Sequence, residues 1–184
     1  MYSNILLFIE NKNYIITTCF PKKEDINNNN IDTYSRIYLL EKGHFIKNIK
    51  GSNLNSTFSV LHWYNKNDNN DYIIECCIGK IFVYNLTKDE IYINYYDEFK
   101  EIYFFNGIII LKNNYDYLVV GGDNGMVYIW NLTTSLLFSL IDFNKNNNIS
   151  FHIFHIENWN TKYFCVSDFS RNTIYFIDFE NLMF

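Results

Sequence analysis

Residues 120–131 read VGGDNGMVYIWN, and this stretch contains the strongest local signal in the sequence. Val, Tyr, Ile and Trp are side chains that favour β-strands. The Asn124-Gly125 dipeptide supplies the positive φ angles that a two-residue hairpin turn needs. We therefore expect a strand over residues 117–121, a tight turn at Asp123-Asn124-Gly125 and a second strand over residues 126–130.

The same order of residue types recurs along the chain, so this hairpin is one copy of a repeat. Each copy has a strand led by tyrosine, a turn, a second strand, and a dipeptide that closes the second strand. The copies lie at residues 13–51, 71–96, 116–141 and 162–179. The closing dipeptides are Leu40-Glu41, Tyr84-Asn85, Trp130-Asn131 and Ile177-Asp178. Another predicted strand precedes each copy, at residues 4–9, 57–63, 99–105 and 149–156.

The spacing of these copies supports the repeat. The second residues of the closing dipeptides are 44, 46 and 47 residues apart. Tyr72, Tyr117 and Tyr163 are 45 and 46 residues apart, whereas Tyr14 precedes Tyr72 by 58 residues. The excess falls in the polar, low-complexity residues 21–32, which we interpret as a loop insertion. We therefore expect one domain over residues 1–184, with units at residues 4–51, 57–96, 99–141 and 149–184.

A period of about 40–45 residues, with a strand that ends in Trp-Asp or a degenerate equivalent, resembles the WD40 repeat. Trp130-Asn131 stands in the place of the Trp-Asp pair. The resemblance implies an all-β, WD40-like β-propeller of about four blades, three of them complete and the fourth with three strands. Within it we interpret ten residues as structural repeat positions: Glu41, Tyr84, Asn85, Asp123, Asn124, Gly125, Trp130, Asn131, Asp168 and Asp178.

The resemblance implies a usual ring of about seven blades, within the range of about 4–8 for closed propellers, so four units form only about half of a usual ring. A stack of repeats leaves an apolar face uncovered at each end, because no unit buries both of its own faces. Three solutions are open: more repeats in a longer chain, completion by a second copy or another polypeptide, and a small four-bladed ring. The missing final strand of the last unit favours the first two.

The composition restricts the class of protein. Hydrophobic residues make up 48% of the chain and aromatic residues 20%, which excludes a disordered chain and favours strands. The formal net charge of -5 gives no general attraction to nucleic acid. No apolar run reaches the ~18–20 residues of a membrane span, and the N-terminus lacks the pattern of a signal peptide. We expect a soluble intracellular protein, cytoplasmic or nuclear, that binds neither nucleic acid nor membrane.

Residues suited to catalysis or metal binding are few. His152 and His155 lie at i and i+3, on opposite faces of a predicted strand, so they form no metal pair there. The sequence contains no catalytic or nucleotide-binding motif. The four cysteines lack the spacing of a metal finger, and we interpret them as reduced packing residues: Cys19, Cys76, Cys77 and Cys165. We expect no cofactor, no metal and no enzymatic activity.

The sequence leaves three functional hypotheses. The WD40 resemblance implies the first, a non-catalytic scaffold that binds protein partners within a larger assembly. Trp63 and Trp159, near the ends of predicted first strands, are candidate anchors for a partner, although core packing also explains them. The second hypothesis is a propeller-based enzyme with a site in the central channel, for which the candidate side chains are those of His44, Asp97 and Asp142. The third is a nucleic-acid-binding propeller, which the acidic balance disfavours.

Overall fold

The computed structural model describes residues 4–9, 12–17, 36–39, 43–49, 57–95, 102–144, 153–158, 162–168 and 173–182. The regular structure of these residues consists of 15 β-strands and one short 3-10 helix. The all-β class predicted from the sequence is confirmed. The described part of the chain contains no helix long and apolar enough to cross a membrane.

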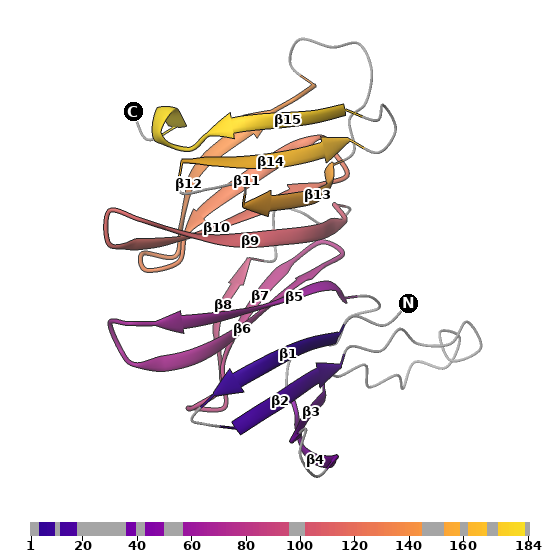
Figure 1. Ribbon diagram of the computed structural model, residues 1–184, viewed down its shortest axis with the longest axis vertical. Coiled ribbons are helices and arrows are strands. Elements are labelled where there is room, and N and C mark those ends of the chain that lie inside the picture. Colours follow the sequence, from indigo (N-terminus) through magenta and orange to yellow (C-terminus); the bar gives the residue numbers. More distant parts are fainter. Residues whose placement is uncertain are drawn as a thin grey trace, which may run out of the picture. The chain divides into compact units, whose positions relative to one another are not determined.

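The strands form four antiparallel sheets, each built from strands that follow one another in the sequence (Figure 1). Sheet 1 contains β1 (Asn4–Ile9), β2 (Lys12–Thr17), β3 (Arg36–Leu39) and β4 (His44–Asn48). Sheet 2 contains β5 (Thr57–Asn65), β6 (Asn70–Cys77), β7 (Ile81–Asn85) and β8 (Glu90–Tyr95). Sheet 3 contains β9 (Phe104–Lys112), β10 (Tyr115–Gly122), β11 (Met126–Asn131) and β12 (Leu136–Asp142). Sheet 4 contains β13 (Ile153–Asn158), β14 (Tyr163–Asp168) and β15 (Thr173–Asp178), and the 3-10 helix η1 (Glu180–Leu182) follows it.

The chain divides into two compact units, Met1–Lys100 and Glu101–Phe184. The first unit contains sheets 1 and 2, and the second contains sheets 3 and 4. Each unit has its own apolar core between its two sheets. The arrangement of all four sheets as blades of one propeller stays a prediction.

In each unit one face of the earlier sheet packs against one face of the later sheet. We call the packed face of the earlier sheet its forward face and the packed face of the later sheet its rear face. The forward-face residues in the two cores are Ile16 and Ile37 of sheet 1 and Tyr117, Val119, Val127 and Ile129 of sheet 3. The rear-face residues are Ile73, Phe82 and Tyr84 of sheet 2 and Phe164, Val166, Tyr175 and Ile177 of sheet 4. Because side chains alternate between the faces of a strand, position within the repeat decides which face a residue occupies.

The leading tyrosines hold equivalent places in three sheets, as their spacing predicts. Tyr72 lies opposite Asn85 in sheet 2, and Tyr163 lies opposite Asp178 in sheet 4. In sheet 3 the equivalent pair is Tyr117 and Asn131. Each tyrosine is on the second strand of its sheet, and each partner closes the third strand.

The residue after each closing position makes the same backbone hydrogen bond. The amides of Leu86, Leu132 and Phe179 donate to the carbonyl oxygens of Asp71, Asp116 and Lys162, each at 2.9 Å. These carbonyls belong to the residues that immediately precede the leading tyrosines. The repeat is therefore present in the backbone as well as in the order of residue types.

In sheet 1 the leading tyrosine pairs with a closing residue of the third strand as in the other sheets, but that residue is not the predicted Glu41. Tyr14 lies opposite Leu39. A β-bulge between the third and fourth strands precedes Tyr38, and the corresponding bulges precede Tyr84 and Trp130. Both observations align Leu39 with the residues that close β7 and β11.

The turn after the third strand gives the same alignment. Gly43, Asp89 and Ser135 have φ angles of 59°, 59° and 60°, and each lies four residues after the closing position. With Leu39 as the closing residue, the spacing becomes 46, 46 and 47 residues. The predicted Leu40-Glu41 is therefore displaced by two residues, and Glu41 itself lies outside the described residues. Leu39 has no side-chain oxygen, so the Asn or Asp signal that marks the other copies is missing here.

The first strands of sheets 3 and 4 also differ from prediction. The sequence predicts a strand over residues 99–105, whereas β9 spans Phe104–Lys112. Asn106 and Gly107 resemble turn residues, but both are inside β9. The side-chain amide of Asn106 donates a hydrogen bond to the carbonyl of Ile156 at 3.2 Å, and this bond links sheet 3 to sheet 4. In sheet 4, β13 begins at Ile153, and residues 149–152 of the predicted strand lie outside the described residues.

The predicted position of the hairpin turn at Asp123-Asn124-Gly125 is confirmed, but the turn is a three-residue loop and not the predicted two-residue turn. Of the Asn124-Gly125 pair, only Gly125 has a positive φ, of 74°. The amide of Gly125 donates to the carbonyl of Gly122 at 3.1 Å, which fits a tight turn followed by a left-handed glycine. Asn124 contributes its side chain instead, since its amide nitrogen donates to the hydroxyl of Tyr128 at 2.7 Å.

Candidate interaction surface

Most of the large hydrophobic side chains that are exposed in the described residues lie on the last strand of a sheet. They are Phe45 and Ile46 on β4, Ile91 and Tyr92 on β8, Leu136, Leu137, Phe138 and Leu140 on β12, and Ile174 and Phe176 on β15. Clusters of exposed apolar side chains often mark interaction sites on soluble proteins.

The longest of these clusters is on β12, and we call Leu136, Leu137, Phe138 and Leu140 the β12 strip. Leu136 is 67% exposed and Leu140 is 46% exposed. Within the described residues β12 pairs on one side only, with β11. The strand carries no charge before Asp142, so it lacks the charged side chains that commonly protect an edge strand from other chains.

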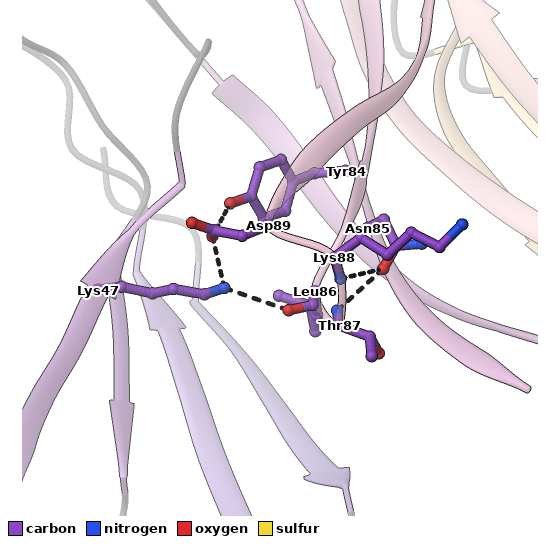
Figure 2. Close-up of polar contacts among 7 residues, drawn as sticks. All are labelled: Lys47, Tyr84, Asn85, Leu86, Thr87, Lys88 and Asp89. Carbon is purple, nitrogen blue, oxygen red and sulfur yellow. Dashed lines mark hydrogen bonds and ion pairs between the residues drawn. The ribbon is translucent and has the colours of Figure 1, made fainter.

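A polar cluster forms around the turn that closes β7 (Figure 2). The side-chain oxygen of Asn85 accepts the backbone amides of Thr87 and Lys88, each at 2.9 Å. This capped turn positions Asp89, whose carboxylate accepts a hydrogen bond from the hydroxyl of Tyr84. The sequence identifies Tyr84 and Asn85 as repeat positions, and the structure brings both into one cluster.

Lys47 joins this cluster from sheet 1. Figure 2 shows its side chain reaching toward the turn, where the ammonium group lies 2.7 Å from the carboxylate of Asp89. It also donates to the carbonyl of Leu86 at 3.2 Å and lies 5.5 Å from the centre of the Tyr84 ring. Burial, followed by the hydrogen bond to Asp89, raises the pKa of Tyr84, so its hydroxyl remains a donor. The cluster joins sheet 1 to sheet 2. We call the contacts of Lys47 with Asp89, Leu86 and Tyr84 the Lys47 latch.

The second unit has a comparable contact. Lys112 on β9 lies 2.6 Å from the carboxylate of Glu180, in the segment after β15. The carboxylate of Asp178 accepts the amide of Glu180 at 2.9 Å and lies 3.2 Å from the ammonium group of Lys162. In both units a lysine of the earlier sheet therefore reaches the segment after the third strand of the later sheet. No local pattern in the sequence predicts these pairs, because the two residues of each pair are 42 and 68 residues apart.

Trp63, a predicted candidate for partner binding, is only 2% exposed. Its ring packs against Tyr72 and Tyr92, at centroid distances of 4.7 and 6.1 Å. The hydroxyl of Tyr72 donates to the carboxylate of Asp68 at 2.5 Å, and burial together with this bond raises the pKa of Tyr72 to about 12. The burial of Trp63 supports core packing over a role in binding. Trp159 lies outside the described residues.

The other predicted structural positions lie within the sheets. The carboxylate of Asp123 accepts the amide of Tyr103 at 2.9 Å, so it holds the hairpin against the start of the first strand. Trp130 is 2% exposed and stacks on Tyr128 at 5.4 Å. Asp168 is 1% exposed at the end of β14. These positions stabilise sheet 3 and sheet 4 and present little surface to a partner.

Candidate catalytic residues are scattered in the described residues. His62 lies 2.6 Å from the carboxylate of Asp71, at the end of β5 and the start of β6. His44 and Asp142 are exposed. Asp97 and His152 lie outside the described residues, as does the side chain of His155. Within the described ranges, no three side chains of His, Cys, Asp or Glu are grouped to hold a metal.

The described cysteines are free thiols. Cys76 and Cys77 are fully buried on β6, and burial raises the pKa of Cys76 to about 12. A thiol must ionise to act as a nucleophile or a metal ligand, so this shift makes Cys76 chemically inert. Cys165 on β14 is half-buried, and Cys19 lies outside the described residues.

The described residues thus combine a repeated turn, lysine contacts between neighbouring sheets and the exposed β12 strip. No protein-family model matches this sequence, and none of the curated proteins compared with it is a significant match.

Proposed function

We propose that this protein is a non-catalytic scaffold whose sheets are blades of a WD40-like β-propeller and which binds protein partners within a larger assembly. The recurrence of one turn and one backbone hydrogen bond in successive sheets supports a repeat of like units. The forward-to-rear packing within both units supports stacking of these units, because repeats of this kind bury their faces against neighbours. Further repeats, a second copy or another chain complete the ring.

The observation that carries the binding role is the β12 strip. An edge strand with exposed backbone groups and uncharged, apolar side chains is suited to the addition of another strand. The partner contributes an extended segment with apolar side chains on both of its faces, because Leu136 pairs with Asn131 and Leu140 with Tyr128, which point to opposite faces of β11. Main-chain hydrogen bonds to β12 supply affinity, and contacts with Leu136 and Leu140 supply specificity.

Affinity purification of the tagged chain from its native cells tests this function. The wild-type chain is expected to retain a partner in stoichiometric amount, identified by mass spectrometry and then purified for a binding titration. Replacing Leu136 and Leu140 by Asp is expected to weaken that binding at least about tenfold, because a charge enters the apolar contact. Leu111→Asp is the matched control, since Leu111 is 55% exposed on β9 and outside the strip. A wild-type chain without any stoichiometric partner contradicts the proposal.

A further inference from the structure

Two of the capped turns also contain the recognition sequence for N-glycosylation, Asn-X-Ser/Thr. They are Asn85-Leu86-Thr87 in sheet 2 and Asn131-Leu132-Thr133 in sheet 3. In both, the asparagine closes the third strand, the leucine amide makes the repeated backbone hydrogen bond, and the threonine amide donates to the side-chain oxygen of the asparagine. The chemistry of the turn therefore accounts for the recognition sequence. A glycan would be attached to the side-chain nitrogen of the asparagine, so the surroundings of that nitrogen decide whether the turn can carry one.

The side chain of Asn131 is enclosed within the second unit. The residue is 9% exposed, and its side-chain oxygen accepts the amides of Thr133 and Thr134 at 3.0 Å. The same side chain forms a hydrogen bond with Tyr117, a residue of the core between sheets 3 and 4. Because the oxygen is directed at the turn, the nitrogen is the group that remains for Tyr117. The rings of Tyr117 and Phe179 are in contact, with centroids 5.3 Å apart, so a glycan on this nitrogen would have to displace core side chains.

Asn85 is held in the same way in sheet 2. It lies opposite the leading tyrosine of its sheet, as Asn131 does. Its side-chain oxygen accepts the amides of Thr87 and Lys88 (Figure 2), and the residue is only 1% exposed. N-linked glycans are bulky, polar groups that belong on protein surfaces. A residue with so little exposure gives a glycan no path to solvent, and burial of an unpaired polar group is strongly unfavourable.

We propose that Asn85 and Asn131 carry no glycan in the native protein, and that N-glycosylation of either one prevents folding. The donor in this reaction is an oligosaccharide linked to a lipid diphosphate. The bond from the first sugar carbon to the diphosphate breaks, a bond from that carbon to the asparagine nitrogen forms, the nitrogen loses one proton, and the lipid diphosphate leaves. The unfolded chain offers both side chains to the transferring enzyme, whereas the folded chain encloses them.

A glycan is therefore added to these turns only before they form, and it then keeps them from forming. It follows that the chain reaches its native structure in a compartment where proteins are not N-glycosylated. This inference concerns the place of folding and does not depend on the proposed scaffold function.

Directing the chain into the endoplasmic reticulum of cultured cells with a cleavable signal peptide tests the inference. Asn55→Gln and Asn148→Gln remove the other two recognition sequences, so only the two turns of this reference chain can be modified. The reference chain is expected to be glycosylated at Asn85 and Asn131 and to be retained in the cell. Peptide mapping after enzymatic removal of the glycans identifies the sites, because that reaction converts a glycosylated asparagine to aspartate.

Thr87→Ala combined with Thr133→Ala removes both recognition sequences and keeps both asparagine caps, because the threonines contribute backbone amides to them. This double variant is expected to be secreted at least about fivefold more efficiently than the reference chain, since cells remove chains that fail to fold. Thr87→Ser combined with Thr133→Ser preserves the recognition sequences and is the matched control, expected to stay in the cell. Production of all three chains in the bacterial cytoplasm, followed by circular dichroism, verifies that the substitutions themselves permit folding.

Three results would overturn the inference. A folded, secreted reference chain with a glycan at Asn85 or Asn131 is one, and a reference chain that is secreted without any glycan is the second. The third is retention of the Thr87→Ala and Thr133→Ala double variant although it folds in bacteria. Partner binding by the chain from its native cells is measured separately, so these results leave the proposed function unaffected.

Discussion

Tyr117 lies directly opposite Asn131, where β10 and β11 pair. The same relationship joins Tyr72 to Asn85 in sheet 2 and Tyr163 to Asp178 in sheet 4. In each sheet the oxygen of the closing side chain accepts a backbone amide of the following segment. A side chain with an oxygen at this position therefore fixes both the end of the third strand and the path of the chain after it.

Replacing Asn131 by Ala is expected to destabilise the protein by about 1–2 kcal/mol, because the amides of Thr133 and Thr134 lose an acceptor at 3.0 Å. Urea denaturation followed by tryptophan fluorescence measures the change. Asn131→Asp is the matched control and should cost less, since it keeps the acceptor oxygen that Asp178 supplies in sheet 4. Equal losses for the two variants would show that the side-chain oxygen does not hold this turn.

Trp130→Ala is expected to cost about 3–5 kcal/mol, the usual range for removing a buried large aromatic side chain. Trp130 contacts Tyr128 and Phe104, with ring centroids 5.4 and 6.3 Å away. Trp130→Tyr introduces the residue that sheet 2 has at the equivalent place, and its cost should be smaller, roughly 1–3 kcal/mol. Thermal denaturation ranks the two variants, and the reverse order would refute the equivalence of Trp130 and Tyr84.

Gly125→Ala is expected to destabilise the protein more than Gly43→Ala. Both glycines have positive φ, of 74° and 59°, which costs about 1–2 kcal/mol for a residue with a side chain. A Cβ at Gly125 would lie 2.5 Å from the side-chain nitrogen of Asn144, whereas at Gly43 it would meet no atom within 4 Å. The added clash disturbs the hydrogen bond from Asn144 to the carbonyl of Asn124. Equal stability losses in urea titrations would rule out this packing effect.

The stability that Tyr72 contributes is expected to disappear at high pH. Its pKa is raised from 10.0 to about 12 by burial and by the hydrogen bond to Asp68. The folded protein therefore holds this proton more tightly than the unfolded chain, so the contribution is complete below pH 10 and is lost as the pH rises toward 12. Urea titrations of the wild type and Tyr72→Phe should show a stability difference that shrinks over this range. A difference independent of pH would contradict the assignment.

Cys165 is expected to react with iodoacetamide faster than Cys76 and Cys77 in the dilute native protein, by roughly tenfold or more, because only accessible thiols ionise and react. Cys165 is half-buried, whereas Cys76 and Cys77 are fully buried. Peptide mapping by mass spectrometry measures each rate separately. Unfolding in urea serves as the control, since all three rates should then converge. Rapid native labelling of Cys76 would contradict its burial.

Much of the fold was predictable from the sequence where the signal is local. Asn131 and Asp178 mark turns because the oxygen of a short side chain can accept hydrogen bonds from the backbone amides that follow it. The same rule failed at Leu39, which closes β3 without any side-chain oxygen and is identified only by its pairing with Tyr14. Asn106 also has a side chain typical of turns, but it lies inside β9, and its amide group donates to the carbonyl of Ile156 in another sheet.

The candidate surfaces were less predictable than the strands. Leu136, Ile174 and Val127 are all apolar residues on strands, and no local pattern tells which of them is exposed. Val127 is buried because sheet 4 covers it, whereas Ile174 precedes Asp178 by four residues, as Val127 precedes Asn131, and is 61% exposed on sheet 4. The Lys47 latch is equally hard to predict, because its residues come together only when sheet 1 packs against sheet 2.

The sequence by itself determined the β class, the order of the strands and the tyrosine register, because these depend on residues that are close in the chain or spaced by one repeat. Tertiary structure decided which faces are covered, which lysines reach a neighbouring turn and where the first copy closes. Those features depend on contacts between residues dozens of positions apart. The local order of amino acids does not show which strand face another sheet will bury.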